Sequence, residues 1–130
     1  MKEKFHVKTF TELIVYKKSR HLSFNLFEKS KNFPQEELYS LTQQVRRSSR
    51  SIGAQIAEAW AKRPYQKHFV SKLTDADAEL QETKHWVLTS YDCGYLEKET
   101  KDKIINECSE IGRILGGMIN KAPKFCNKED

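Results

Sequence analysis

The stretch QEELYSLTQQVRRSSRSIGAQIAEAWAK, residues 35–62, decides the fold of this chain. Apolar side chains recur in it every three or four residues, which is the spacing of one face of an α-helix. Two glutamates stand in its first turn, where the positive end of the helix dipole favours acids. We therefore predict one long amphipathic helix over residues 35–62. Its apolar stripe is Leu38, Leu41, Val45, Ile52 and Ile56.

Three further segments repeat this pattern, and we predict helices over about residues 10–32, 65–93 and 97–121. Pro34 and Pro64 separate the first three segments, because the residue before a proline avoids the helical conformation and proline itself suits a helix start. Gly94 suits the end of the third segment. Long helices joined by short connections lie antiparallel. The predicted fold is all-α, an antiparallel up-down four-helix bundle over residues 10–121, between a flexible N-terminus at 1–9 and a flexible tail at 122–130.

The composition fits a single-domain cytoplasmic protein. The chain has 130 residues, and its charged fraction of 32% suits solvated helix faces. No apolar run has the length of a membrane span, and no signal-peptide pattern follows Met1, so we predict no membrane contact. The three cysteines lack the paired spacing of metal ligands, and we predict no metal and no cofactor. We interpret Cys93, Cys108 and Cys126 as structural or incidental.

The side of the 35–62 helix opposite its apolar stripe is unusual. It carries arginines in its first half and alanines in its second half. Small residues let another backbone approach closely, so this side is a candidate contact with another subunit. The alternative is a solvated surface on which alanine serves only as a strong helix former. The predicted oligomer interface is Arg47, Arg50, Ala54, Ala57 and Ala61.

Arg46, Arg47 and Arg50 crowd like charges onto one surface, because they stand three or four residues apart on a helix. Opposite charge can come from an acidic strip on the third helix, which gives salt bridges within or between subunits. It can also come from phosphate, which arginine binds through two parallel hydrogen bonds. The acidic strip is Asp75, Glu79 and Glu82.

We predict that RNA or DNA contacts a basic surface of the protein through its phosphates. The net charge of +5 permits such a partner. Phosphate contacts carry little sequence information and weaken as the salt concentration rises. The alternative is a structural or protein-scaffolding module in which the arginines form salt bridges between subunits. The candidate residues are Arg46, Arg47 and Arg50, supported by Lys17, Lys18, Arg20, Lys62 and Arg63, with Trp60 and Tyr65 as nearby aromatic residues.

Two short motifs match catalytic or metal-binding spacings, and we interpret both as accidental. Glu82 and His85 have the Glu-x-x-His spacing of di-iron bundles, but no second copy of the motif is found. Arg63 and His68 have the Arg-x4-His spacing of HEPN-type ribonucleases, in which the arginine would stabilise phosphate charge and the histidine would act as acid or base. That motif spans a helix start at Pro64. We predict no catalytic residue and keep ribonuclease activity as a remote alternative.

A set of spaced residues runs through the first three predicted helices. It comprises Phe33-Pro34, Glu37, Leu41, Gln44, Arg46-Arg47-Ser48, Ser51-Ile52, Ile56-Ala57-Glu58, Phe69, Leu73, Ala76, Glu82 and Gly94-Tyr95-Leu96. The set resembles the family of 23S rRNA intervening-sequence proteins, whose usual core reads approximately F-P-x-x-E, then L-x-x-Q-x-R-R-A, then S-I-x-x-N-I-A-E-G. The chain departs from the family pattern at Gly53, Gln55, Ala59 and Ala78-Glu79.

This resemblance implies a homopentamer of antiparallel four-helix bundles. Members are often encoded in insertions within 23S rRNA genes. The family is also similar in fold to the accessory variability protein of diversity-generating retroelements, a basic pentamer that binds nucleic acid and a reverse transcriptase. We therefore expect self-association, and the analogy of fold adds support for a nucleic-acid partner and leaves a protein partner open.

Overall fold

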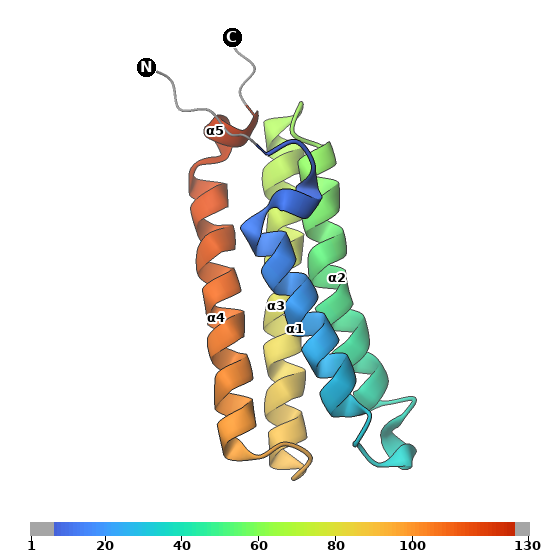
Figure 1. Cartoon of the computed structure of the whole chain (residues 1–130). Coiled ribbons are helices and arrows are strands. Elements are labelled where there is room, and N and C mark those ends of the chain that lie inside the picture. Colours follow the sequence, from blue (N-terminus) through green and yellow to red (C-terminus); the bar gives the residue numbers. More distant parts are fainter. Residues whose placement is uncertain (1–6, 127–130) are drawn as a thin grey trace.

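The computed structural model describes residues 7–126, which form a bundle of helices (Figure 1). Successive long helices run in opposite directions, so that the α1–α2 and α3–α4 connections lie at the same end of the bundle. The predicted all-α, up-down four-helix bundle is confirmed. The elements are η1 (Phe10–Glu12), α1 (Ile14–Ser30), η2 (Gln35–Glu37), α2 (Leu41–Ala61), α3 (Gln66–Asp92), α4 (Lys98–Asn120) and α5 (Ala122–Cys126).

The apolar stripes of the four long helices form one core. Ile52 and Ile56 of α2 and Leu80 of α3 are 0% exposed. Burying a side chain of this size contributes about 1.5–3 kcal/mol, so the core supplies most of the stability of the bundle. Cys108 belongs to this core, as its place on the apolar stripe of α4 indicates. The outer faces are charged, and no helix within residues 7–126 combines the length and apolar character that a bilayer span requires.

The second helix begins later than the sequence predicts. Residues 35–37 form a 3-10 turn, and the backbone of Ser40 leaves the helical region with φ −128° and ψ −99°, so α2 starts at Leu41. The hydroxyl of Ser40 donates to Glu37 Oε1 at 2.7 Å. Because the side chain of Leu38 precedes α2, it is half-buried and does not extend the core stripe as predicted. The connection therefore carries its own polar contacts.

Glu37 also links this connection to the turn between α3 and α4. The hydroxyl of Tyr95 donates to Glu37 Oε2 at 2.9 Å, which raises the pKa of Tyr95 to about 12. Gly94 precedes this tyrosine with φ +82°, and the N–H of Tyr95 donates to the carbonyl of Ser90 at 2.9 Å. This is the Schellman arrangement that ends a helix at glycine. The prediction that Gly94 terminates the third helix is confirmed.

The C-terminal segment differs from the predicted flexible tail. Ala122 to Cys126 form the short helix α5, and Ala122 is buried. The ring of Phe125 stacks on Phe69 at 5.9 Å between centroids and meets Trp60 edge-on at 6.5 Å. The physical reason is that Trp60 of α2 and Phe69 of α3 lie at the end of the bundle, where the ring of Phe125 packs on both of them. Of the predicted flexible N-terminus, Val7 packs partly buried against the core and the N–H of Lys8 donates to Glu12 Oε1 at 3.2 Å. Residues 1–6 and 127–130, also predicted to be flexible, lie outside the described residues.

Candidate nucleic-acid interface

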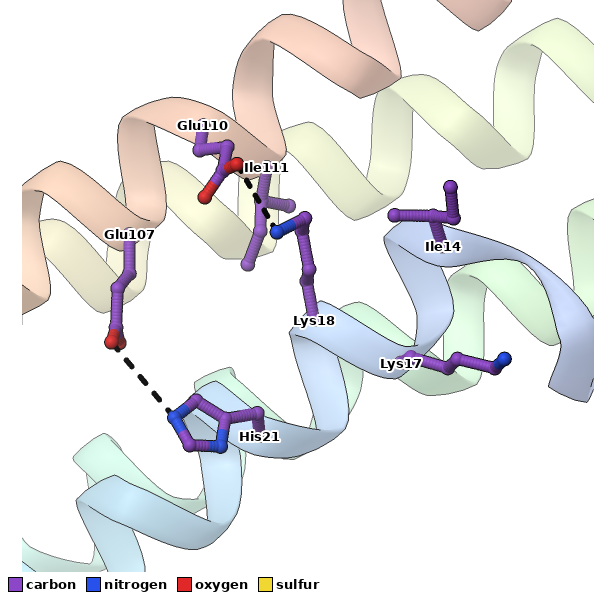
Figure 2. A pocket seen from close by; sticks show the side chains of 7 residues that line it. All are labelled: Ile14, Lys17, Lys18, His21, Glu107, Glu110 and Ile111. Atoms are coloured by element: carbon purple, nitrogen blue, oxygen red, sulfur yellow. Dashed lines mark ion pairs between the residues drawn. The ribbon is translucent and has the colours of Figure 1, made fainter.

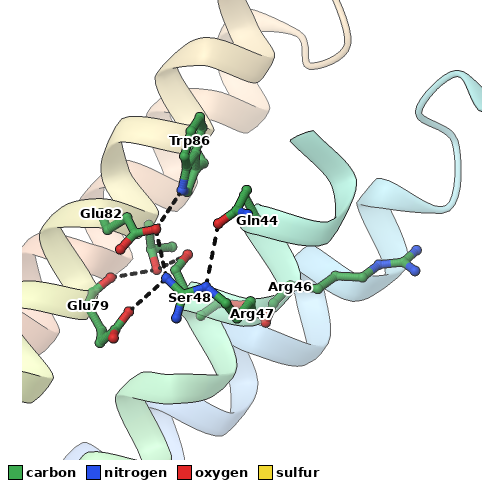
Figure 3. A network of polar contacts seen from close by, with 9 residues as sticks. Gln44, Arg46, Arg47, Ser48, Glu79, Glu82 and Trp86 are labelled. Atoms are coloured by element: carbon green, nitrogen blue, oxygen red, sulfur yellow. Dashed lines mark hydrogen bonds and ion pairs between the residues drawn. The ribbon is translucent and has the colours of Figure 1, made fainter. Parts of the chain in front are cut away.

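Arg47 points from α2 toward α3 and is neutralised within the chain (Figure 3). Its Nη2 lies 2.7 Å from Glu82 Oε2 and 3.4 Å from Glu79 Oε1. The indole N–H of Trp86 donates to the same Glu82 oxygen at 3.0 Å. The hydrogen bond from Trp86, followed by that from Arg47, lowers the pKa of Glu82, and the hydrogen bond to Glu82 raises the pKa of Arg47. The predicted acidic strip thus supplies the counter-charge of one arginine.

A buried hydrogen bond accompanies this ion pair. The hydroxyl of Thr83 lies 2.9 Å from that of Ser48, and both residues are 0% exposed. Buried hydroxyls need such partners, because an unpaired polar group in the core is costly. We call this contact between the helices the α2–α3 seam, defined by Arg47, Ser48, Glu79, Glu82 and Thr83.

Asp75, the third member of the acidic strip, does not reach the arginines. Its carboxylate lies 3.8 Å from Lys72 Nζ. Lys72 in turn lies 2.8 Å from Glu58 and donates to the side-chain oxygen of Gln55 at 3.2 Å. These contacts add to the polar contacts between α2 and α3. Within residues 7–126, no carboxylate of the acidic strip pairs with Arg46 or Arg50.

Arg46 and Arg50 point toward α1 and lie against one aromatic ring. Their guanidinium carbons are 4.8 Å and 5.4 Å from the centroid of Phe27. Arg46 Nε donates to the hydroxyl of Ser30 at 2.8 Å. Within residues 7–126, neither arginine has a carboxylate within 4.0 Å. Each guanidinium is therefore held in place by α1 while its charge is left uncompensated.

Arg50 also lies between two depressions in the surface. The first, of about 590 Å³, includes Tyr39, Arg46 and the ion-paired Arg47 in its lining. The second, of about 320 Å³, lies between α1 and α2 and includes Arg20 and Gly53. A Cβ on Gly53 would lie 3.2 Å from the hydroxyl of Ser19, so the two helices approach closely at its floor. We call Arg20, Arg46 and Arg50 the arginine face.

The alanine half of α2 continues from the arginine face toward the other end of the helix. Ala54 and Ala61 are exposed and Ala57 is half-buried, so this edge faces away from the core. The prediction that these alanines, with Arg47 and Arg50, meet another subunit stays a prediction. Arg47 already has two carboxylate partners in its own chain, whereas Arg50 has none in the described part of it.

The two predicted lysines of α1 lie in a different place, in a groove between α1 and α4 (Figure 2). Lys18 pairs with Glu110 at 3.1 Å, and Lys17 lines the same depression of about 360 Å³. Further along the groove, His21 lies 3.9 Å from Glu107. The groove mixes both signs of charge, so it is a weaker candidate for phosphate than the arginine face.

Lys62, Arg63 and Trp60 lie at the end of α2. The guanidinium carbon of Arg63 is 3.7 Å from the centroid of the Trp60 ring, and its Nε donates to the Trp60 carbonyl at 2.9 Å. Burial lowers the pKa of Arg63. The exposed ring of His68 meets that of Tyr65 at 5.7 Å, and no hydrogen bond in the described part of the chain joins it to Arg63. The two residues of the Arg-x4-His motif therefore have separate partners.

The other motif is likewise occupied by structural contacts. Glu82 serves Arg47 and Trp86, while His85 packs edge-on against Trp86 with centroids 4.7 Å apart. Across residues 7–126, no group of three or more histidine, cysteine, aspartate or glutamate side chains is placed to hold a metal ion.

Sequence reasoning missed the aromatic part of the arginine face. Phe24 is 63% exposed and Tyr39 is 84% exposed, and both lie near the arginines rather than near Trp60. A signal was present in the sequence, because an arginine, two phenylalanines and a lysine recur at one helical spacing along α1. These residues are Arg20, Phe24, Phe27 and Lys31.

The fold and the site define a class of small helical bundle with an arginine-rich face. Residues 11–117 match the model of the 23S rRNA-intervening sequence protein family, and the chain belongs to that family. The chain is also similar to a solved structure from Bacteroides thetaiotaomicron, described as a protein with unknown function from the S23 ribosomal protein family. The TM-score is 0.74 at 29% identity, covering 82% of this chain and 96% of the other. No curated protein matches the chain significantly.

Proposed function

We propose that this chain is a non-enzymatic, homo-oligomeric four-helix bundle that binds RNA or DNA through phosphate contacts on the arginine face. One observation carries the proposal. Three arginines from two helices converge on adjoining depressions and have no carboxylate partner in residues 7–126. Arg47 and Lys18 of the same chain pair with its own glutamates, so the lack of carboxylate partners distinguishes the arginine face from these other cations.

The geometry of the arginine face suits phosphate. Contact with the Phe27 ring orders Arg46 and Arg50, which lowers the entropy that a ligand contact would otherwise cost. Nη donors of both guanidiniums remain available for the paired hydrogen bonds that phosphate accepts. Like charges on successive helical turns repel, and a phosphate between them removes that repulsion. The expected binding is therefore largely independent of sequence and sensitive to salt.

Self-association is the second part of the proposal. The alanine half of α2 offers a close approach to another copy, because Ala54 and Ala61 are exposed small side chains. The family resemblance implies a pentamer, which would repeat the arginine face around the assembly. A cytoplasmic location fits such a protein. The alternative of a scaffolding module needs acidic residues of another subunit at Arg46 and Arg50.

The test compares two triple variants of equal charge. The first is Arg20→Ala, Arg46→Ala and Arg50→Ala, and the matched control removes three exposed cations from the α4 side. Binding to RNA and to duplex DNA is measured over a salt series. We expect the first variant to reduce the slope of log affinity against log salt by roughly 2 to 3, at about 0.7–0.9 per phosphate contact. The control residues are Lys103, Arg113 and Lys121.

Light scattering coupled to size-exclusion chromatography completes the test. Each variant should retain the assembly mass of the wild type, which we expect to be a multiple of the 15.3 kDa chain. Equal salt slopes for the two triple variants would remove the arginine face as the binding surface. A loss of assembly in the first variant alone would favour the scaffolding alternative, and a monomeric wild type would overturn the self-association.

A further inference from the structure

We propose that the arginine face prefers an unpaired strand of RNA or DNA, whose bases stack on Phe24 and Tyr39. This inference rests on the proposed function, because it assumes that nucleic acid binds at this face. It adds the form of nucleic acid that the face recognises. It also assigns roles to two aromatic residues that are otherwise exposed without a structural task.

Two aromatic side chains lie between two cationic ones along the outer edge of α1. Arg20, Phe24, Phe27 and Lys31 follow one another at intervals of three or four residues and therefore share one face of the helix. The ring of Phe27 already contacts three cations: Lys31 Nζ lies 4.8 Å from its centroid, and both Arg46 and Arg50 of α2 lie against it. Phe24 is its neighbour at 6.4 Å between centroids and is 63% exposed.

Tyr39 supplies a second exposed ring near the arginines. It stands just before α2, is 84% exposed, and lines the same depression as Arg46 and Arg50. Within residues 7–126, its hydroxyl has no hydrogen-bond partner. Two exposed rings therefore lie near the arginines: Tyr39 lines the depression of Arg46 and Arg50, and Phe24 neighbours the ring on which both arginines lie.

Exposed rings beside unpaired arginines suit a single strand better than a duplex. Backbone phosphates recur along a strand with bases between them, so a surface that binds both must present cations beside flat rings. Bases of an unpaired strand are free to stack on such rings, and this stacking tolerates every base because each has a π-face. In a duplex the bases are stacked on one another, so only the phosphates reach the arginines. Exposed rings would add nothing to duplex binding.

The experiment uses the full chain and three labelled probes of equal length: oligothymidine, oligouridine and a DNA duplex. Fluorescence anisotropy at one low salt concentration gives the affinity for each. We expect both single strands to bind more tightly than the duplex. Phe24→Ala and Tyr39→Ala should each weaken single-strand binding roughly 5-fold to 150-fold, the range measured for loss of one stacked base, and leave duplex binding unchanged.

Two controls separate stacking from other effects. Phe24→Tyr and Tyr39→Phe keep the rings and should retain single-strand affinity. Tyr65→Ala removes a ring that is 66% exposed just before α3 and should change nothing. The α2–α3 connection, to which Tyr65 belongs, lies at the end of the bundle opposite to the α1–α2 connection. Light scattering checks that each variant keeps the wild-type mass.

The outcomes distinguish this inference from the proposed function. Wild type that binds no probe ends the proposed function itself. Wild type that binds duplex as tightly as single strands, with no effect of either alanine variant, overturns the stacking inference and leaves phosphate binding in place. A change of assembly mass in Phe24→Ala or Tyr39→Ala also overturns it, because another copy of the chain then covers the ring.

Discussion

Arg47 and Arg50 lie one turn apart on α2, and their surroundings are opposite. Arg47 faces α3, where two glutamates hold it at 2.7 Å and 3.4 Å. Arg50 faces α1, where it meets an aromatic ring at 5.4 Å and no carboxylate in the described chain. Residues three apart point only about 60° apart around the helix axis, and this small difference places Arg47 beside α3 and Arg50 beside α1. Neighbouring arginines of one motif thus have different partners, carboxylates at the α2–α3 seam and an aromatic ring at the arginine face, and only the arginine face is proposed to bind a ligand.

The largest effect is expected from the buried hydrogen bond of the α2–α3 seam. Thr83→Val leaves the Ser48 hydroxyl in the core without its partner, which we expect to lower the free energy of unfolding by about 1–3 kcal/mol. Ser48→Ala in the same chain removes the second polar group, so the double variant should recover most of that loss. Urea unfolding of the wild type, both single variants and the double variant measures this coupling. If the losses of unfolding free energy in the two single variants add up to the loss in the double variant, the hydrogen bond between Ser48 and Thr83 does not contribute to stability.

The fold was open to prediction because every long helix carries its own amphipathic stripe and its own stop signal. Pro34, Pro64 and Gly94 lie at the three connections, and the Schellman turn at Gly94 has the geometry that its glycine predicts. The short helix α5 was missed because five residues carry no periodicity. Its reason is tertiary, since Phe125 packs on Phe69 and Trp60, two rings that are distant in sequence.

The site was only partly open to prediction. The sequence identified the arginines and two possible sources of opposite charge, the acidic strip and phosphate. It did not show which arginine pairs with the acidic strip and which remains unpaired. That division depends on which side of α2 each neighbouring helix occupies. Phe27 explains why: its ring holds Arg46 and Arg50 across a helix contact that no local spacing within α2 reveals. The exposed rings of Phe24 and Tyr39 were overlooked because exposure is a tertiary property.

An intermediate effect is expected from removing the two arginines one at a time. Arg47→Ala breaks an exposed ion-pair network and should lower the free energy of unfolding by about 0.5–1 kcal/mol. It should leave nucleic-acid affinity close to that of the wild type. Arg50→Ala should have the opposite pattern, and its free energy of unfolding should differ from that of the wild type by less than about 0.5 kcal/mol. Its affinity for nucleic acid should fall, with a salt slope lower by about 0.7–0.9.

Each variant serves as the control for the other, because both remove one positive charge from the same helix. Chemical denaturation and anisotropy on the same preparations provide both measurements. If Arg47→Ala weakened nucleic-acid binding as much as Arg50→Ala, net charge rather than the arginine face would govern the binding.

The smallest effect concerns pH and the charge of Glu82. Hydrogen bonds from Trp86 and Arg47 lower the pKa of this carboxyl below its ordinary value of 4.5. A carboxyl with a lowered pKa in the folded state stabilises the fold fully above its unfolded pKa, and this contribution is lost as the pH falls through the folded pKa. Glu82→Gln keeps the shape and the hydrogen-bond acceptor but removes the charge. We expect the variant to unfold more easily by a few tenths of a kcal/mol at pH 7, as for an exposed ion pair, and to match the wild type in acid.

Repeating the Glu82→Gln measurement in an Arg47→Ala variant tests whether the ion pair of the α2–α3 seam causes this pH dependence. In a chain that already carries Arg47→Ala, the Glu82 charge has lost its arginine partner and keeps the hydrogen bond from Trp86 and the nearby His85. The loss of stability caused by Glu82→Gln should then shrink at neutral pH. If it keeps its full size, the indole and not the guanidinium stabilises the carboxylate. Arg47 would then be as free to meet a ligand as Arg50, and the contrast between the two sides of α2 would rest on geometry alone.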